Sequence, residues 1–211
     1  MLNIPQIVEI IFNILILLGA IVFHEYAHGW VAFKCGDRTA KLAGRLTLNP
    51  IKHIDPVGTV ILPIALYTFF RMPFGWARPV PINFNNLQNP RRDIMLVAIA
   101  GPAINILGAL LFGQLTNLNV SPAAQIWLVR IVGINCFLAA FNLIPIPPLD
   151  GSRIALGLLP RQLAELYSRL EPWGFILIIV LAHLKCLDFV HEIAMYLTNY
   201  FVHYNGAIKF I

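Results

Sequence analysis

This sequence contains few charged residues. Only 12% of the 211 residues are charged and 58% are hydrophobic, whereas a soluble domain typically carries about 25% charged residues. No stretch long enough for a separate soluble domain has the composition of one. We therefore predict an all-α polytopic membrane protein with a single domain over 1–211, made of a core over about 5–160 and C-terminal helices over about 161–203.

Cysteine and clustered basic residues are also scarce. Cys35, Cys136 and Cys186 lack Cys-x-x-Cys spacing, which excludes a disulfide framework and a thiolate zinc site. The basic residues are scattered through short loops, so we expect no nucleic-acid partner. No Lys or Arg precedes Lys34, unlike in a signal peptide, so we expect the first apolar stretch to remain as a transmembrane helix in the lipid bilayer.

The apolar stretches predict about five to six transmembrane or re-entrant helical segments. They lie at about 5–33, 57–70, 94–116, 124–144, 173–184 and 187–203. The segment 57–70 is short and contains Pro63, and basic loops flank it on both sides. These features favour a re-entrant segment, and the alternative is a span across a thinned bilayer.

The polar segments between these stretches predict short extended structure and a topology. Alternating residues over Thr39–Leu48 indicate a short strand, and Trp76–Phe84 is expected to be extended near the active site. Loops 34–56, 71–92 and 146–171 are basic, so the positive-inside rule places them in the cytoplasm and places loop 117–122 outside.

One motif in the first apolar stretch carries chemistry: His24-Glu25-Tyr26-Ala27-His28. On a helix it puts two imidazoles on one face, where they can bind Zn²⁺, with Glu25 beside the metal to accept a proton. The alternative is a pair of histidines hydrogen-bonded within a helical bundle. Because His24 lies about 15 Å from the basic end at Lys34, we expect the site to be below the membrane surface, nearer the cytoplasm.

A catalytic zinc takes three protein ligands and keeps an open position for water. Asp150 follows a proline-rich break at the cytoplasmic end of the 124–144 span, so it arrives at the depth of the histidines. Spacing alone fits Asp150 equally well as a ligand or as the N-cap of a helix that starts near Ser152. The other candidate ligands are His53, Asp55, Asp93, His183 and His191.

Three motifs in order resemble the signature of the site-2 protease family of intramembrane zinc metalloproteases. They are HEYAH in the first span, GPAIN at Gly101–Asn105 and NLIPIPPLDG at Asn142–Gly151. The stretch LTLNPIKHIDPVGT at Leu46–Thr59 further resembles the compact prokaryotic branch of that family.

The resemblance implies that Asp150 is the third zinc ligand and that Glu25 is the general base. Asn105 and Asn142 match motif asparagines that resemble substrate-backbone or oxyanion contacts, and hydrogen bonding between helices is the alternative for both. His53 matches a motif position, where it either stabilises a turn or contacts the metal or the substrate.

These observations predict a zinc-dependent intramembrane endopeptidase with one Zn²⁺ per chain. Its substrates would be transmembrane proteins or peptides, cut within or near their membrane spans. We expect a multi-pass protein of a prokaryotic plasma membrane, with the active site near the cytoplasmic side. The alternative is a non-proteolytic membrane zinc-binding protein or transporter, which would be expected to show internal repeats with paired broken helices.

Overall fold

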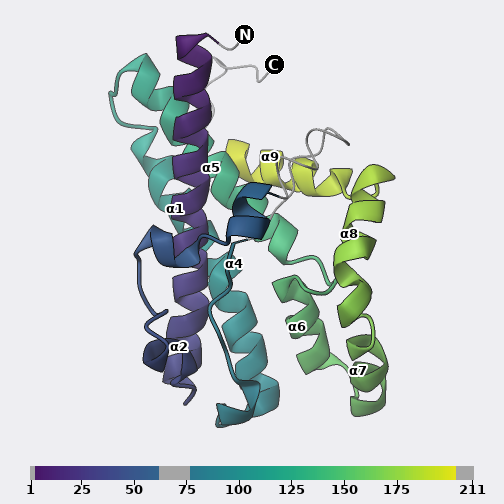
Figure 1. Ribbon diagram of the computed structural model, residues 1–211. Helices are drawn as coiled ribbons and strands as arrows, with labels where there is room; N and C mark the ends of the chain where they lie inside the picture. Colours follow the sequence, from purple (N-terminus) through teal and green to yellow (C-terminus); the bar gives the residue numbers. More distant parts are fainter. Residues whose placement is uncertain (1–2, 62–76, 203–211) are drawn as a thin grey trace.

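In the part of the chain that the structure describes, helices are joined by short irregular segments (Figure 1). The computed structural model describes residues 3–61 and 77–202, and within these ranges there is no strand. In chain order the elements are α1 (Ile4–Lys34), α2 (Thr39–Leu42), η1 (Pro50–His53), η2 (Pro56–Ile61), η3 (Phe84–Asn86), α4 (Pro90–Leu115), α5 (Pro122–Asn142), α6 (Asp150–Leu158), α7 (Arg161–Ser168), η4 (Glu171–Trp173), α8 (Gly174–His183) and α9 (Asp188–Val202).

Three of these helices, α1, α4 and α5, are long and apolar enough to cross a membrane. They match the spans predicted at 5–33, 94–116 and 124–144. The segments Arg161–His183 and Asp188–Val202 pass the same test only as one pair, bent by 78°. The described residues therefore give three spans, or four if the bent pair is one span, and five to six are not confirmed. Most of the predicted re-entrant segment, residues 62–70, lies outside the described ranges.

Local sequence signals fix where the long helices begin. At the start of α1, the Asn3 side chain accepts from the Gln6 N–H, and the Gln6 side chain accepts from the Asn3 N–H, both at 3.0 Å. At the start of α5, Ser121 Oγ accepts from the Ala124 N–H at 3.3 Å. Each helix also has proline in its first turn, where a missing N–H costs nothing.

The predicted strand over Thr39–Leu48 is wrong, because its first residues form the short helix α2. The cause is Asp37, whose carboxylate accepts from both the N–H and the hydroxyl of Thr39. Hydrogen bonds of this kind turn the chain into a helical start. The alternation of residue types within 39–48 could not reveal this helical start, because the side chain that causes it, Asp37, lies before the segment.

The extended segment predicted over Trp76–Phe84 is not confirmed as β structure. Residues 77–83 form neither a helix nor a strand, Phe84 begins the helical turn η3, and Trp76 lies outside the described residues. Pro79 and Pro81 have no N–H to donate to a strand ladder. The segment nevertheless lies against α1, where the Val80 N–H donates to the Glu25 side chain.

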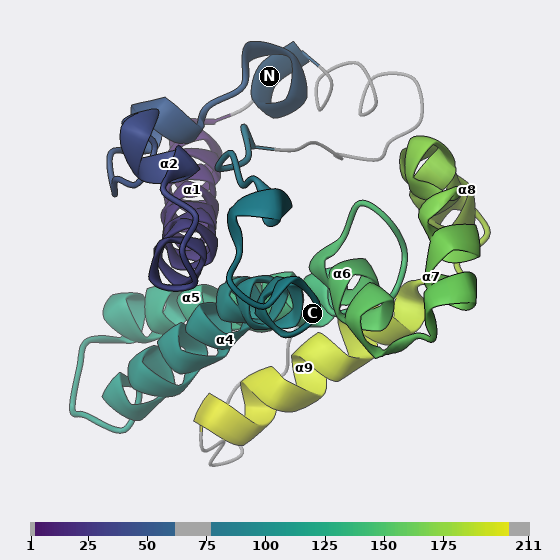
Figure 2. The ribbon, with the colours of Figure 1, turned by 90° about the horizontal axis from the view of Figure 1, so that it is seen from below.

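Helix α4 is the centre of the packing, with α1, α5, α6 and α9 against it. Small buried side chains from α4, α5 and α9 form one core cluster: Ala109, Val132, Cys136 and Ala194. Viewed from below, α1 and α8 stand on opposite sides of the molecule, with α4 and α6 between them (Figure 2). Many apolar side chains of α1 remain exposed, as expected for a lipid-facing helix: Ile7, Ile10, Ile11, Ile14 and Leu15.

Candidate active site

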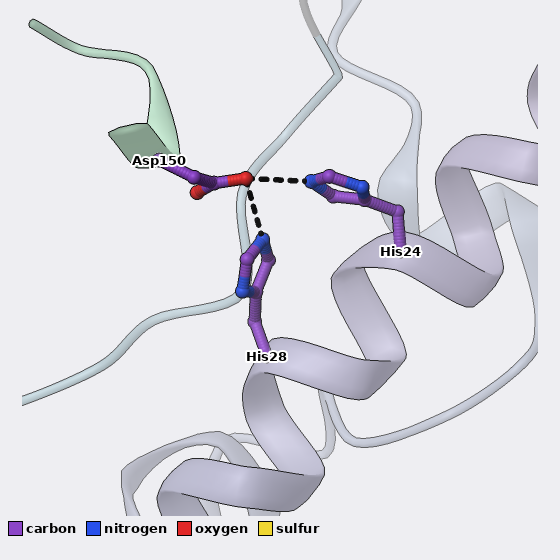
Figure 3. A group of neighbouring side chains, drawn as sticks. All are labelled: His24, His28 and Asp150. Carbon is purple, nitrogen blue, oxygen red and sulfur yellow. Dashed lines mark hydrogen bonds and ion pairs between the residues drawn. The ribbon is translucent and has the colours of Figure 1, made fainter. Parts of the chain in front are cut away.

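Two histidines of α1 and one aspartate of α6 come together at a single point (Figure 3). Nε2 of His24 lies 3.0 Å from Oδ2 of Asp150, and Nε2 of His28 lies 3.2 Å from the same oxygen. Both imidazoles are buried and the carboxylate is nearly so. The helical spacing of the motif and the break before α6 thus converge on one possible metal site.

The far sides of both imidazoles are held by hydrogen bonds. His28 Nδ1 donates to the Val97 carbonyl at 2.7 Å, and this fixes the proton on Nδ1 because a carbonyl can only accept. His24 Nδ1 donates to Asn105 Oδ1 at 2.6 Å. The amide of Asn105 is oriented by its own Nδ2, which donates to the Ala20 carbonyl. In the neutral form, each histidine therefore presents the lone pair of Nε2 toward Asp150.

Three acceptor atoms that face one another at such distances repel unless a positive charge lies among them. When both histidines are neutral, a metal ion bound among the three atoms would supply this positive charge. Two imidazole nitrogens and one carboxylate oxygen form a ligand set that suits Zn²⁺, with a fourth position left for water.

A glycine of α4 makes room for this ligand set. A Cβ atom on Gly101 would lie 2.4 Å from Nε2 of His28 and 2.5 Å from Nε2 of His24. Any side chain at Gly101 would therefore occupy the space in which the two nitrogens face Asp150. Part of the GPAIN motif is explained by this close approach of α4 to the candidate metal site.

Glu25 lies beside the ligands but takes no part in the cluster. Its Oε2 accepts a hydrogen bond from the backbone N–H of Val80 at 2.8 Å. Glu25, the two histidines and Asp150 all line a cavity of about 630 Å³. The remaining walls are largely apolar and come from the 77–84 segment, α4, α5 and α8, for example Ile82, Leu138 and Ile178. A cavity of this size with few polar groups is typical of a substrate site.

The alternative assignment of Asp150 as an N-cap is wrong. Helix α6 begins at Asp150 itself, Leu149 is the capping residue, and no side chain caps the helix. The carboxylate instead turns back toward α1.

The other candidate ligands are not part of the cluster among the described residues. Asp93 Oδ2 accepts from the N–H of Asn89 at the start of α4, and Asp55 Oδ1 accepts from the N–H groups of Val57 and Gly58. His53 is fully buried and its Nε2 contacts the Thr47 carbonyl at 2.9 Å, which is the turn-stabilising alternative. His183 ends α8 and His191 lies in α9.

The two motif asparagines have different surroundings. Asn105 is buried, and it joins α1 and α5 through His24 and through Asn135 Oδ1, which accepts from its Nδ2 at 2.9 Å. This is the hydrogen bonding between helices that was the alternative to a substrate contact. Asn142 lines the cavity, and its Nδ2 donates to the Leu138 carbonyl of its own helix at 3.0 Å.

Sequence reasoning missed the groups that hold the candidate ligands and Glu25. The Val97 carbonyl and the Val80 N–H are backbone groups of a kind that almost every residue has, so no sequence pattern could have singled them out. Gly101 was visible as part of a motif, and its place before a proline in an apolar helix was a signal of close helix packing.

Comparison with known proteins gives relatives that share one description. The chain is 39% identical over 178 residues to "Putative zinc metalloprotease YwhC" of Bacillus subtilis, covering 80% of this chain and 78% of that protein. It is 30% identical to "Putative zinc metalloprotease Rip2" of Mycolicibacterium smegmatis, covering 80% of this chain and 66% of that protein. The chain belongs to this family of zinc metalloproteases.

An archaeal member of the family, "Putative zinc metalloprotease MJ0611" of Methanocaldococcus jannaschii, is 30% identical over 71% of each chain. No family model matches the sequence, and no solved structure matches it. Membership agrees with the resemblance to site-2 proteases and with the ligand set on α1 and α6. It supports zinc-dependent proteolysis over the transporter alternative.

Proposed function

We propose that this protein is an intramembrane endopeptidase that uses one Zn²⁺ per chain to hydrolyse peptide bonds in or near transmembrane segments. The observation that carries the proposal is the convergence of Asp150 of α6 with His24 and His28, which lie beside Glu25 on a helix apolar enough to cross a membrane. Ionisable groups placed within a membrane segment are costly and usually functional.

In this proposal His24, His28 and Asp150 hold the zinc ion. When bound, the ion supplies Lewis-acid chemistry, which lowers the pKa of water toward about 7 and polarises the scissile carbonyl. Glu25 takes a proton from the attacking water and delivers it to the leaving amine as the C–N bond breaks. Asn142, which lines the cavity, is placed to donate to the developing oxyanion after a rotation away from Leu138.

The substrate in this proposal is a transmembrane helix that must unwind before it is cut, because its peptide groups are hydrogen-bonded internally. The segment 77–83 forms one wall of the cavity and contacts Glu25 through Val80. We propose that an unwound substrate pairs with the backbone of this segment, as peptides pair with an exposed strand edge in other proteins.

The proposed location is a prokaryotic plasma membrane, with several spans and with the active site near the cytoplasmic side. Support comes from the three long apolar helices and from the basic loops at the Lys34 end of α1. A reporter fused after Asn85 should give a cytoplasmic signal, and an external signal would contradict the topology.

The decisive experiment uses the full chain purified in detergent, with bound zinc quantified and single-span peptides as substrates. Glu25→Gln should lower kcat by about 10²-fold to 10⁴-fold and leave about one zinc per chain, since Glu25 is not a proposed ligand. Glu192→Gln, the same change at an exposed position of α9, is the matched control and should cleave normally. Zinc transport into vesicles that survives Glu25→Gln, without peptide cleavage by the wild type, would favour the transporter alternative.

A further inference from the structure

The cavity wall formed by residues 77–83 is fastened to the rest of the protein by two side chains of the loop that follows α1. Arg45 is buried, with 8% of its surface exposed, and its Nη2 donates to the carbonyls of Arg78 at 2.9 Å and Pro79 at 3.2 Å. At the other end, Asp37 accepts from the Asn83 N–H at 2.8 Å and from Asn86 Nδ2 at 2.9 Å.

Val80 lies between the residues that Arg45 and Asp37 bind, and it contacts the candidate active site. Its N–H donates to Glu25 Oε2, and its side chain is buried against α1. A Cβ atom on Gly29 would lie 2.9 Å from Cγ1 of Val80, so the glycine allows the segment to lie close to the helix. Glu25 and Gly29 are one helical turn apart, and both face the same short stretch of backbone.

The peptide bond that Arg45 holds through the Pro79 carbonyl is the bond whose N–H contacts Glu25. A planar peptide fixes its carbonyl and its N–H in opposite directions. When the guanidinium holds the Pro79 oxygen on one side, it therefore fixes the direction in which the Val80 hydrogen points on the other. Burial of the Arg45 guanidinium also costs desolvation free energy, whereas a hydrogen bond from an exposed side chain would not carry this cost.

We propose that Arg45 is a positioning residue for the proteolytic reaction, and that it acts on Glu25 through the Pro79–Val80 peptide bond. Arg45 fixes this peptide so that the Val80 N–H holds one oxygen of Glu25, which leaves the other oxygen directed for proton transfer. This inference rests on the proposed function for its catalytic part. Its structural part, the coupling of Arg45 to the Val80 amide, stands independently.

The test compares Arg45→Met, which keeps the length of the side chain and removes its donors, with Arg45→Lys, which keeps a cationic donor. Arg38→Met, at an exposed position in the same loop, removes the same charge and is the matched control. Zinc content, kcat and KM are measured on single-span peptides. Hydrogen exchange of the 77–84 peptide, where Val80 lies between two prolines without amides, reports on the segment itself.

We expect Arg45→Met to lower kcat by about tenfold or more with a smaller change in KM, because a misdirected base weakens the chemical step rather than binding. Zinc content should stay at the wild-type level, Arg45→Lys should regain most of the activity, and Arg38→Met should match the wild type. The Val80 amide should exchange about tenfold faster in Arg45→Met, since its opening costs less.

The exchange measurement separates the two proposals. If the wild type cleaves no peptide, the proposed function fails, while faster Val80 exchange in Arg45→Met still supports the coupling. If the wild type cleaves and Arg45→Met keeps the wild-type kcat or the wild-type Val80 exchange, the positioning role is overturned. If Arg45→Met does not fold, full loss of kcat in a folded, zinc-loaded Arg45→Lys would also contradict it, because that variant retains a donor.

Discussion

His24 Nδ1 lies 2.6 Å from Oδ1 of Asn105, on the side of the imidazole that faces away from Asp150. This contact joins α1 to α4 and fixes which nitrogen of His24 faces the candidate metal site. A ligand histidine held in this way binds metal more tightly, since its ring is already oriented and its tautomer is set.

Asn105→Ala should therefore weaken zinc binding by about 10-fold to 100-fold, as is usual when the hydrogen-bond partner of a ligand is lost. Competition with a chelator of known affinity measures this change. Asn142→Ala is the matched control, because Asn142 lines the cavity without contacting a histidine in any described hydrogen bond. It should keep the wild-type zinc affinity and lower kcat. Equal zinc affinities in the two variants would contradict the inference that Asn105, and not Asn142, supports a zinc ligand.

Gly101→Ala should abolish zinc binding or reduce it severely. The added Cβ would lie 2.4 Å and 2.5 Å from the two Nε2 atoms, so either the histidines or α4 must move. Zinc per purified chain and the rise in Tm on adding zinc both report the loss, since a ligand that binds only the folded state stabilises it.

Gly19→Ala is the control for helix propensity, because it lies in α1 and a Cβ there meets nothing within 4 Å. It should bind zinc normally and be as stable as the wild type or slightly more so. A Gly101→Ala variant that binds zinc with wild-type affinity would refute the steric argument.

The parts of the site that could be predicted are those that one helix or one motif encodes. His24 and His28 share a face because of helical periodicity alone, and α1 was recognisable as a long apolar helix. Asp150 was different: spacing left a ligand and an N-cap equally open, and the resemblance decided between them. The structure agrees with the ligand, because α6 starts at Asp150 and leaves its carboxylate free to turn toward α1.

The parts that could not be predicted depend on contacts between distant segments. The strand expected over Thr39–Leu48 is wrong because the Asp37 carboxylate accepts hydrogen bonds from Thr39, and it also binds Asn83 and Asn86, far along the sequence. The hydrogen bond from Val80 to Glu25 joins residues 55 positions apart through a backbone atom. Local patterns carry no information about such pairs.

Asp37→Asn should lower the free energy of unfolding relative to the wild type, and the size of this loss should depend on pH. Burial alone would raise the pKa of the Asp37 carboxyl, but hydrogen bonds from Thr39, Asn86 and Asn83 lower that pKa below its ordinary value. A group with a lowered pKa contributes stability above its unfolded pKa, and this contribution is lost as the pH falls through the folded pKa. We expect a deficit of about 1–3 kcal/mol at neutral pH, the usual cost of losing hydrogen bonds to a charged group.

Thermal unfolding in detergent at a series of pH values measures this deficit. The difference in the free energy of unfolding between the wild type and Asp37→Asn should stay constant from neutral pH down to about 5 and narrow progressively below that. Glu165→Gln, at an exposed position of α7, should show a small deficit of at most about 0.5 kcal/mol. If this difference in free energy of unfolding instead grew as the pH fell, the predicted stabilisation by the ionised Asp37 would be contradicted.

Ile82→Pro should block cleavage of a transmembrane substrate while leaving zinc bound. Val80 and Ile82 both line the cavity, and the prolines at 79 and 81 already lack N–H groups, so Ile82 offers the next backbone donor along this wall after Val80. If an unwound substrate pairs with this segment, loss of that N–H removes a main-chain hydrogen bond that positions the scissile bond. Ile82→Ala removes most of the side chain but keeps the N–H, so it should retain more activity than Ile82→Pro. Kinetics on one single-span peptide compare the two, and full activity in a zinc-loaded Ile82→Pro would rule out pairing through this residue.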